Sequence, residues 1–232
     1  MLLDDGTWEI QGRRLRFPVR IRHARAACAT YLVGTDRARE LVAGTGLELV
    51  SVAGRTPLFL AIVDYRDSDL DAYGEVGVAF LVRHRGRTGP YIHQLPVTQT
   101  FTMEAGRALW GLPKWLGRAE LVIDGPDARC HLADDGGRHV LTAVLRALSP
   151  RLPGRLGGSV TALAPHPGGV YASAVRARVG GVRVGRAAAL VLAHGHPMAE
   201  ELRALDLPRR PLAVVTADRV SFEMDAALDV PA

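Results

Sequence analysis

PLFLAIVDY (57–65) and EVGVAFLVRH (75–84) are two apolar runs that lie close together in the chain. Both are rich in valine, leucine and phenylalanine, and each has the length of one strand. RDSDLDAYG (66–74), the segment between them, is polar and has the composition of a solvated loop. The two runs therefore predict two β-strands.

The same signal recurs along most of the chain. Arginine alternates with apolar residues in RRLRFPVRIRHAR (13–25), which is typical of strands with one wet face. DDGG (134–137) has the composition of a hairpin turn, and Pro/Gly-rich stretches at 149–158 and 164–169 indicate loops. The other expected strands are 28–33, 47–53, 90–97, 118–124, 127–133, 138–147, 171–180, 182–193 and 212–224.

Helices are expected at only three places. They cover 36–43, 102–110 and 197–205, with Thr35, either Thr100 or Thr102, and Pro197 at their respective starts. Gly44 would end the first helix, and Gly111 with Pro113 would end the second. Many strands with few short helices predict a mainly β (α+β) protein, built on a curved antiparallel sheet closed into a barrel. No glycine-rich nucleotide motif follows a strand.

The length suits one large domain or two small ones, the composition is ordinary for a soluble globular protein, and a single domain over 1–232 is expected. No stretch reaches the roughly 18 uninterrupted apolar residues of a membrane helix, and MLLDDGTWEI at the N-terminus lacks the pattern of a signal peptide. Cys28 and Cys130 have no metal-site or disulfide spacing, and we expect buried free thiols in a reducing compartment. A cytoplasmic protein without membrane contact is therefore expected.

The net charge of +5 raises the question of nucleic-acid binding. The arginines are scattered, however, and acidic residues lie among them, so a nucleic-acid partner is not favoured. A mild positive field that favours acidic small molecules is the better interpretation.

Lys114 is the single lysine among the 29 basic residues. An arginine side chain stays protonated in a protein, whereas a lysine can lose its proton on burial, and only a neutral amine attacks a carbonyl carbon. The alternative explanation is that Lys114 lies on the surface and has been kept by chance. Its surroundings in MEAGRALWGLPKWLG (103–117) favour a chemical role, because Pro113 stops the preceding helix and bulky apolar residues would desolvate the ammonium.

AGRALWGLPK (105–114) and YGEVGVAFLV (73–82), at their mutual spacing, resemble the acetoacetate decarboxylase family. Weaker similarity at 30–42 and 185–225 extends the resemblance over most of the chain. The resemblance implies a cone-shaped β-barrel with a few helices, usually oligomeric. It also implies that the covalent lysine Schiff base replaces any cofactor, and no metal is expected.

Site residues carried over from this resemblance begin with Lys114 as the Schiff-base lysine and Glu75 as the active-site acid. Tyr73 resembles a tyrosine that some members direct at the substrate, and it shares a strand face with Glu75. Arg107 matches the arginine of the family motif and is interpreted mainly as structural. The other candidate substrate-binding residues are Arg25, Trp110, Trp115, Glu104 and His93.

This chain departs from the decarboxylating members at several positions. Trp115 stands where they carry a second lysine, and Leu60 stands where they carry another carboxylate. Their early arginine falls on Ala24, with Arg22 and Arg25 close by, and one of these two is expected to pair with a substrate carboxylate. The changes argue for a substrate other than acetoacetate.

Two motifs outside this segment are weak metal candidates. His194 and His196 lack an obvious third ligand. Asp67, Asp69 and Asp71 lack the glycine and the final glutamate of a calcium loop.

The sequence therefore predicts a Schiff-base lyase acting on a keto acid or related carbonyl compound, with decarboxylation as the leading reaction. An aldolase-dehydratase or cyclase of secondary metabolism that uses the same lysine is one alternative. A non-catalytic ligand-binding barrel is the other.

Overall fold

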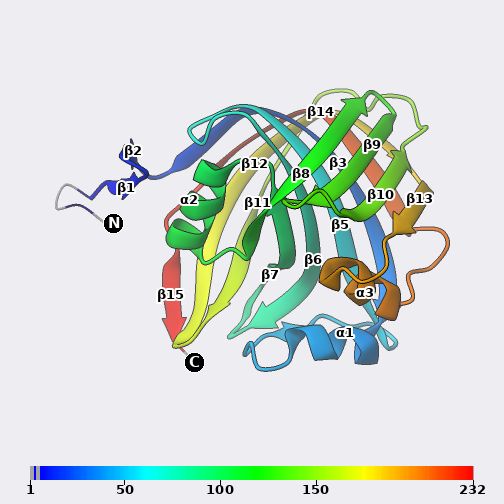
Figure 1. The fold of residues 1–232 in the computed structure, drawn as a ribbon, viewed down its shortest axis with the longest axis horizontal. Coiled ribbons are helices and arrows are strands. Elements are labelled where there is room, and N and C mark those ends of the chain that lie inside the picture. The colour runs from blue at the N-terminus through cyan, green and yellow to red at the C-terminus, as the bar shows by residue number, and fades with distance from the viewer. Residues whose placement is uncertain (1–2, 4–5, 232) are drawn as a thin grey trace.

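The computed structural model describes Leu3 and residues 6–231, and strands dominate them (Figure 1). In chain order the strands are β1 (Trp8–Ile10), β2 (Arg13–Leu15), β3 (Val19–Gly34), β4 (Glu48–Leu49), β5 (Arg55–Ser68), β6 (Tyr73–His84), β7 (Arg87–Val97), β8 (Lys114–Asp124), β9 (Asp127–Asp134), β10 (His139–Arg146), β11 (Arg155–His166), β12 (Gly169–Gly185), β13 (Ala187–Leu192), β14 (Ala213–Met224) and β15 (Leu228–Pro231). The helices are α1 (Thr35–Val42), α2 (Thr100–Trp110) and α3 (Pro197–Ala204).

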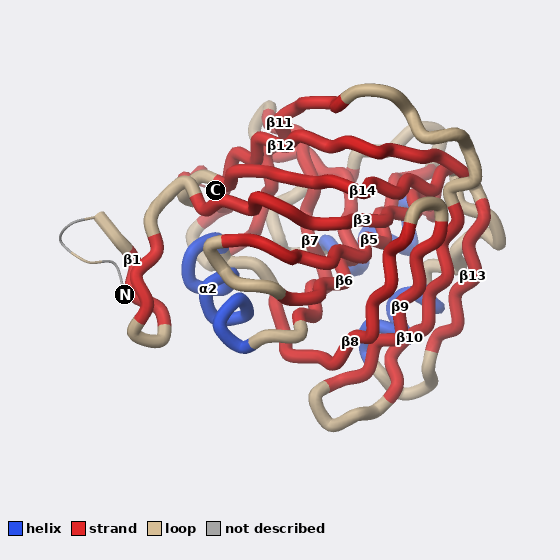
Figure 2. The backbone as a smooth tube through the Cα atoms, turned by 90° about the horizontal axis from the view of Figure 1, so that it is seen from above, coloured by secondary structure: helices blue, strands red, loops and turns tan. Residues whose placement is uncertain are grey.

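One large, strongly curved sheet holds most of these strands (Figure 2). Its pairings can be followed around a ring that runs β3, β5, β6, β7, β11, β12, β14 and back to β3. The pairings are antiparallel except between β7 and β11, which meet in parallel at Tyr91 and Leu163. A second antiparallel group, β8–β9–β10–β13, joins the ring through a short parallel contact of β8 with β7.

The expected mainly β architecture with a curved antiparallel sheet and short helices is confirmed. Several boundaries differ. The strand expected at 47–53 shrinks to β4, and the loop expected at 164–169 is a hairpin whose strands reach His166 and resume at Gly169. The strand expected at 182–193 breaks at Arg186, between β12 and β13.

Helix starts also differ from expectation, although all three helices are present. Gly34 rather than Thr35 precedes α1, and it offers no side-chain cap. Gln99 caps α2 by accepting a hydrogen bond from the backbone N–H of Thr102, so neither Thr100 nor Thr102 is the cap. Pro197 does occupy the first turn of α3, where a missing N–H costs nothing.

The apolar side chains form two buried clusters on opposite faces of the sheet. Alternation along β6 separates them, because successive side chains of a strand point to opposite faces. Val76, Val78 and Phe80 belong to the larger cluster, whereas Tyr73 belongs to the smaller one. The smaller cluster also contains Phe101 of α2, so this helix covers the face of β6 that carries Tyr73.

The β1–β2 hairpin and the helices α1 and α3 lie at the edges of the molecule. The β1–β2 hairpin projects from the body near α2, while α1 and α3 lie together at another edge (Figure 1). Among the described residues, no helix has the length and apolar character needed to cross a membrane.

Candidate active site

Lys114 is the first residue of β8, and the preceding turn fixes its backbone. Gly111 ends α2 with a φ of 66°, a left-handed conformation that glycine adopts without strain. The backbone N–H of Lys114 donates to the Leu112 carbonyl at 2.8 Å, and the Arg107 Nε donates to the Lys114 carbonyl oxygen at 2.6 Å. Arg107 therefore contacts the backbone of the lysine, which is consistent with the structural role expected of it.

The Lys114 side chain is only 3% exposed and lies among polar groups from two other elements. Its Nζ is 3.0 Å from Oε2 of Glu75 on β6 and donates to Oγ1 of Thr102 on α2 at 3.0 Å. It also lies 5.0 Å from the centroid of the Tyr73 ring. The fold thus brings Lys114 into one buried cluster with Tyr73 and Glu75, which belong to a distant part of the sequence.

Gly106 of α2 forms the wall against which the lysine stem lies. A Cβ at this position would be 2.5 Å from Cδ and 2.6 Å from Cε of Lys114, closer than nonbonded carbon atoms approach. Thr102 and Gly106 are four residues apart and so share one face of the helix. That face supplies a hydroxyl to Nζ and space to the methylene groups.

Glu75 is held on its other side by a second buried group. The Tyr65 hydroxyl donates to Oε1 of Glu75 at 2.9 Å, and the Tyr65 and Tyr73 rings are stacked at 4.3 Å. Burial, followed by the negative charge of Glu75, raises the pKa of both tyrosines well above the usual value. Both hydroxyls therefore keep their protons at neutral pH, and the Tyr65 hydroxyl donates its proton to the hydrogen bond with Glu75.

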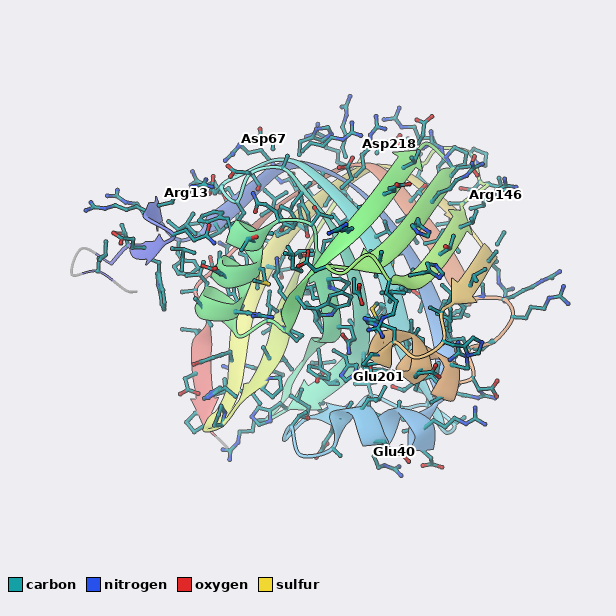
Figure 3. The ribbon with its side chains drawn as sticks, viewed as in Figure 1. Arg13, Glu40, Asp67, Arg146, Glu201 and Asp218 are labelled. Atoms are coloured by element: carbon teal, nitrogen blue, oxygen red, sulfur yellow. The ribbon has the colours of Figure 1, made fainter. Side chains whose placement is uncertain are left out.

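Trp115 and His93 lie on the opposite side of the strands from this cluster. Trp115 packs against the larger apolar cluster, and its Nε1 donates to Oε1 of Gln94 at 2.9 Å. His93 Nε2 is 3.0 Å from Oε2 of Glu201, a residue of α3 labelled in Figure 3. The structure does not bring either residue to the Lys114 amine.

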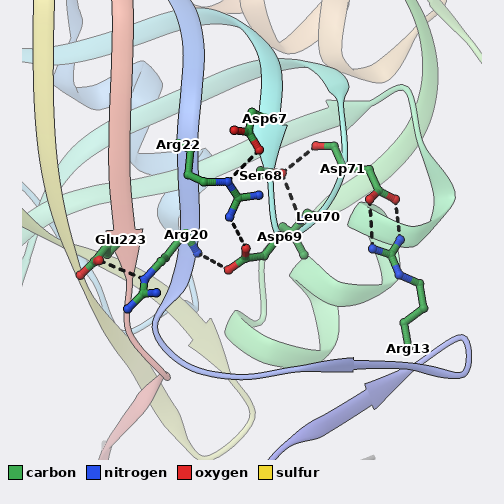
Figure 4. Close-up of polar contacts among 9 residues, drawn as sticks. All are labelled: Arg13, Arg20, Arg22, Asp67, Ser68, Asp69, Leu70, Asp71 and Glu223. Carbon is green, nitrogen blue, oxygen red and sulfur yellow. Dashed lines mark hydrogen bonds and ion pairs between the residues drawn. The ribbon is translucent and has the colours of Figure 1, made fainter.

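Arg25 and Arg22 also make their contacts elsewhere. Arg25 donates to the carbonyl oxygen of Ile123 at 2.9 Å. Arg22 forms surface ion pairs with Asp67 and Asp69 (Figure 4). The expectation that one of these arginines faces the lysine finds no support in their contacts, because β3 contributes Val19, Ile21 and Ala24, and neither arginine, to the cluster with Tyr73.

Trp110 and Glu104 of α2 have different environments. Trp110 is buried in the smaller apolar cluster, where its Nε1 donates to the carbonyl oxygen of Asp225 at 2.8 Å. It therefore lies in the apolar surroundings of the site rather than against Nζ. Glu104 is exposed. The burial pattern of α2 thus places Glu104 on the solvent side of the helix.

Thr102 and Tyr65 are the members of the cluster that the sequence did not indicate as site residues. The sequence predicts Thr102 only as a possible helix cap. Its spacing of four from Gly106, in the helix before the lysine, was the available signal. Tyr65 pairs directly with Tyr73 across β5 and β6, a register that becomes visible only in the folded sheet.

The cluster has the groups needed for amine chemistry. Nζ and Oε2 of Glu75, 3.0 Å apart, are close enough to exchange a proton directly. Carboxyl and hydroxyl groups surround the nitrogen, ready to move protons to and from a bound carbonyl oxygen.

A family model described as acetoacetate decarboxylase (ADC) matches residues 9–217. The chain belongs to the acetoacetate decarboxylase family. A curated relative, acetoacetate decarboxylase 3 of Mesorhizobium japonicum (strain LMG 29417 / CECT 9101 / MAFF 303099), is 34% identical over 53 residues. That match covers 23% of this chain and 21% of the relative, so it spans about a fifth of that protein.

Solved structures share the fold of this family member. The acetoacetate decarboxylase of Legionella pneumophila subsp. pneumophila str. Philadelphia 1 superposes with a TM-score of 0.74 at 17% identity, covering 94% of this chain and 90% of that one. The enduracididine biosynthesis enzyme MppR complexed with pyruvate gives a TM-score of 0.66 at 18% identity, covering 96% and 92%. At these identities the likeness concerns the fold.

Histidines and acids elsewhere do not gather into a metal site in the described part of the chain. No group of three or more His, Cys, Asp or Glu side chains is arranged to hold an ion there. His194 and His196 flank Gly195 in the turn before α3, and Asp67, Asp69 and Asp71 contact arginines instead.

Proposed function

We propose that this family member is a lyase that binds a carbonyl substrate covalently, as a Schiff base on Lys114. The observation that carries the proposal is the buried contact of the chain's single lysine with Glu75 and Thr102. A buried amine beside a carboxyl group can be relieved of its proton and can receive it back, which is what nucleophilic attack and its reversal require.

The first step joins Nζ to the substrate carbonyl carbon. The neutral amine attacks that carbon, a C–N bond forms, and the carbonyl oxygen leaves as water after taking up protons. Glu75 is the group placed to supply and retrieve these protons, because Oε2 lies 3.0 Å from Nζ. The product is an iminium ion, which draws electrons from the adjacent bonds.

Decarboxylation of a β-keto acid is the leading reaction, and the family match supports it. The bond between the α-carbon and the carboxylate breaks, CO₂ leaves, and the electron pair moves into the iminium to give an enamine. The enamine carbon then takes a proton, and water hydrolyses the resulting iminium to release the ketone and Lys114.

An aldol or dehydration reaction through the same enamine is the second candidate. The observation that favours it concerns the arginine expected to pair with a substrate carboxylate: Ala24 lies in the cluster with Tyr73, and Arg25 donates to the Ile123 carbonyl instead. A related structure of MppR contains the condensation product of pyruvate and imidazole 4-carboxaldehyde. Here the enamine carbon would attack an aldehyde carbon, and loss of water would follow.

Borohydride trapping tests the Schiff base. The protein is incubated in turn with acetoacetate, pyruvate and acetone, reduced, and analysed by peptide mass spectrometry. We expect a reduced adduct on the peptide containing Lys114 with at least one compound, and none in Lys114→Arg. Absence of an adduct with every carbonyl compound tried would contradict the proposal and favour a non-catalytic ligand-binding barrel.

Measurement of released CO₂ separates the two reactions. A decarboxylase releases CO₂ from β-keto acids and stops doing so in Lys114→Arg. An aldolase-dehydratase forms the adduct without CO₂ release and consumes an added aldehyde.

We also infer that the ring of strand pairings is the cone-like barrel expected from the sequence, and that residues 1–232 form one domain. A homo-oligomer in the cytoplasm is the expected state of the protein. Sedimentation analysis at micromolar concentration tests the assembly, and a monomer would contradict it.

A further inference from the structure

Trp115, Gln94 and Glu201 form a chain of side-chain contacts on the far side of the strands from the Lys114 amine. The Trp115 indole donates to Oε1 of Gln94 at 2.9 Å, and Nε2 of Gln94 donates to Oε2 of Glu201 at 2.9 Å. His93 contacts the same oxygen of Glu201 at 3.0 Å. The chain thus connects β8 to β7 and both to α3.

The backbone connection at this point is weak. β8 pairs with β7 through only three residue pairs, Leu95 with Lys114, Pro96 with Trp115 and Val97 with Leu116. Proline has no backbone N–H, so the middle position of β7 cannot donate to the ladder. From Gly117 onward β8 pairs with β9 instead. The segment that carries Lys114 is therefore held to the large sheet by little backbone hydrogen bonding.

Trp115 is suited to hold this segment in place. Adjacent strand residues point to opposite faces, so an anchor at residue 115 fixes the backbone without occupying the space around the amine of residue 114. The indole ring also lies 5.4 Å from the ring of His196, which is 8% exposed. Both its polar edge and its face are therefore in contact with other elements.

We propose that Trp115, Gln94 and Glu201 act as positioning residues that set the location of Lys114 relative to Glu75. This latch, as we call the three residues, would keep Nζ within 3.0 Å of both Oε2 of Glu75 and Oγ1 of Thr102. Because proton transfer and attack depend on sub-ångström placement, a drift of about 1 Å can slow a reaction about 100-fold. Trp115 thereby acts on the chemistry through Lys114 and not through the substrate.

Two substitutions remove the same hydrogen bond from either end. Trp115→Phe keeps most of the apolar ring and loses the indole N–H, while Gln94→Met keeps the length of the side chain and loses the acceptor. If one variant fails to fold, the other still tests the latch. Thr216→Val is the matched control, because it removes one hydrogen bond of 2.9 Å, from buried Thr216 to the Gly125 carbonyl near the far end of β8.

The readout uses the single lysine. In protein labelled with ¹³C-lysine, Lys114 gives one side-chain ε-CH₂ resonance, which reports its surroundings directly. We expect this resonance to shift or split in Trp115→Phe and in Gln94→Met, and to keep its wild-type position in Thr216→Val. A wild-type resonance in both latch variants, or an equal shift in the control, would overturn the proposal.

A kinetic measurement also tests the latch, and this second test rests on the proposed function. The rate of borohydride-trapped adduct formation should fall about 10- to 100-fold in each latch variant. The double variant should be no slower than Gln94→Met alone, because Gln94→Met already removes the Trp115 hydrogen bond as well as the one to Glu201. Absence of an adduct in the wild-type protein would count against the Schiff base alone, and the lysine resonance would still decide whether the latch exists.

Discussion

At the residue scale, Gly106 has the clearest effect on the position of the Lys114 side chain. Its missing Cβ leaves room for the Lys114 stem, and Gly106→Ala would put a carbon 2.5 Å from Cδ. The alanine suits a helix, so the helix gains while the lysine must move. We expect Schiff-base formation to slow at least about 10-fold, with a change in unfolding free energy of no more than about 1–3 kcal/mol.

Chemical denaturation and trapping kinetics of Gly106→Ala, measured side by side, check this expectation. Ala108→Gly is a suitable control on the exposed side of α2, since it alters helix propensity without approaching the lysine. Unchanged trapping kinetics in Gly106→Ala would mean that the lysine stem can relocate without cost.

Much of the candidate site was predictable at the residue scale. Lys114 and Glu75 carry motif signals that do not depend on the fold, and Tyr73 follows from strand alternation. Trp115 could not be placed by alternation, because the strand was expected to begin at residue 118, whereas β8 begins at Lys114. The side of the strand that Arg25 occupies depends on a bulge. β3 contains register shifts between Ile21 and Ala24, which alter the alternation just before Arg25.

At the scale of an element, α3 is attached to the sheet through a carboxylate. Glu201 contacts His93 and Gln94, and His196 and Tyr91 are the other titratable groups near it. Burial acts to raise the pKa of Glu201, but the hydrogen bond and charge of His93 and the Gln94 amide outweigh it, and the net pKa lies below the usual value.

The sign of the pH effect follows from this lowered pKa. A carboxyl group whose pKa is lower in the folded than in the unfolded protein stabilises the fold above its unfolded pKa, and this contribution is lost as the pH falls through the folded pKa. We therefore expect the unfolding free energy of the wild type to fall more steeply than that of Glu201→Gln between about pH 5 and about pH 3. Parallel pH profiles from urea titrations would contradict this role of Glu201.

Elements with a strong local pattern were predicted well, and those that depend on partners were not. β5 and β6 have apolar runs that indicate strands in any context. β11 begins inside a Pro/Gly-rich stretch, and its residues 155–160 are exposed, so no apolar pattern marks it. Its strand conformation comes from pairing with β12 along its whole length.

At the scale of the whole molecule, the two thiols lie in different places: Cys130 belongs to the larger apolar cluster, and Cys28 does not. Cys130 of β9 is buried, whereas Cys28 of β3 is only partly so, which corrects the expectation that both are fully buried. Burial raises the pKa of Cys130 to about 12 and that of Cys28 to about 11, the latter opposed by a hydrogen bond with Thr30. At neutral pH both sulfurs are therefore protonated and poorly nucleophilic.

Thiol reactivity should consequently follow global unfolding. With an aromatic disulfide reagent at about pH 8, we expect very slow modification of the native protein and rapid modification of two thiols in denaturant. Since β9 lies within a sheet and pairs on both edges, Cys130 becomes accessible only when those pairings open. Fast modification of Cys130 in native buffer would show that this part of the sheet opens locally.

The sequence was enough to predict the fold class, but not the order in which the strands pair. The strand content and the scarcity of helices follow from composition and periodicity. The backbone pairing of β7 with β11 consists of the single pair of Tyr91 and Leu163, and no sequence signal indicates that these two strands meet. The same holds for the approach of α2 to β6, which brings Thr102 to the lysine.

The most direct test of the Schiff-base proposal is the mass of the Lys114 peptide after borohydride reduction in the presence of carbonyl compounds. We predict a covalent adduct on Lys114 in the wild-type protein, a slower adduct in Trp115→Phe, and none in Lys114→Arg. An unmodified Lys114 peptide after reduction with every β-keto acid, α-keto acid and simple ketone tried would contradict the central claim.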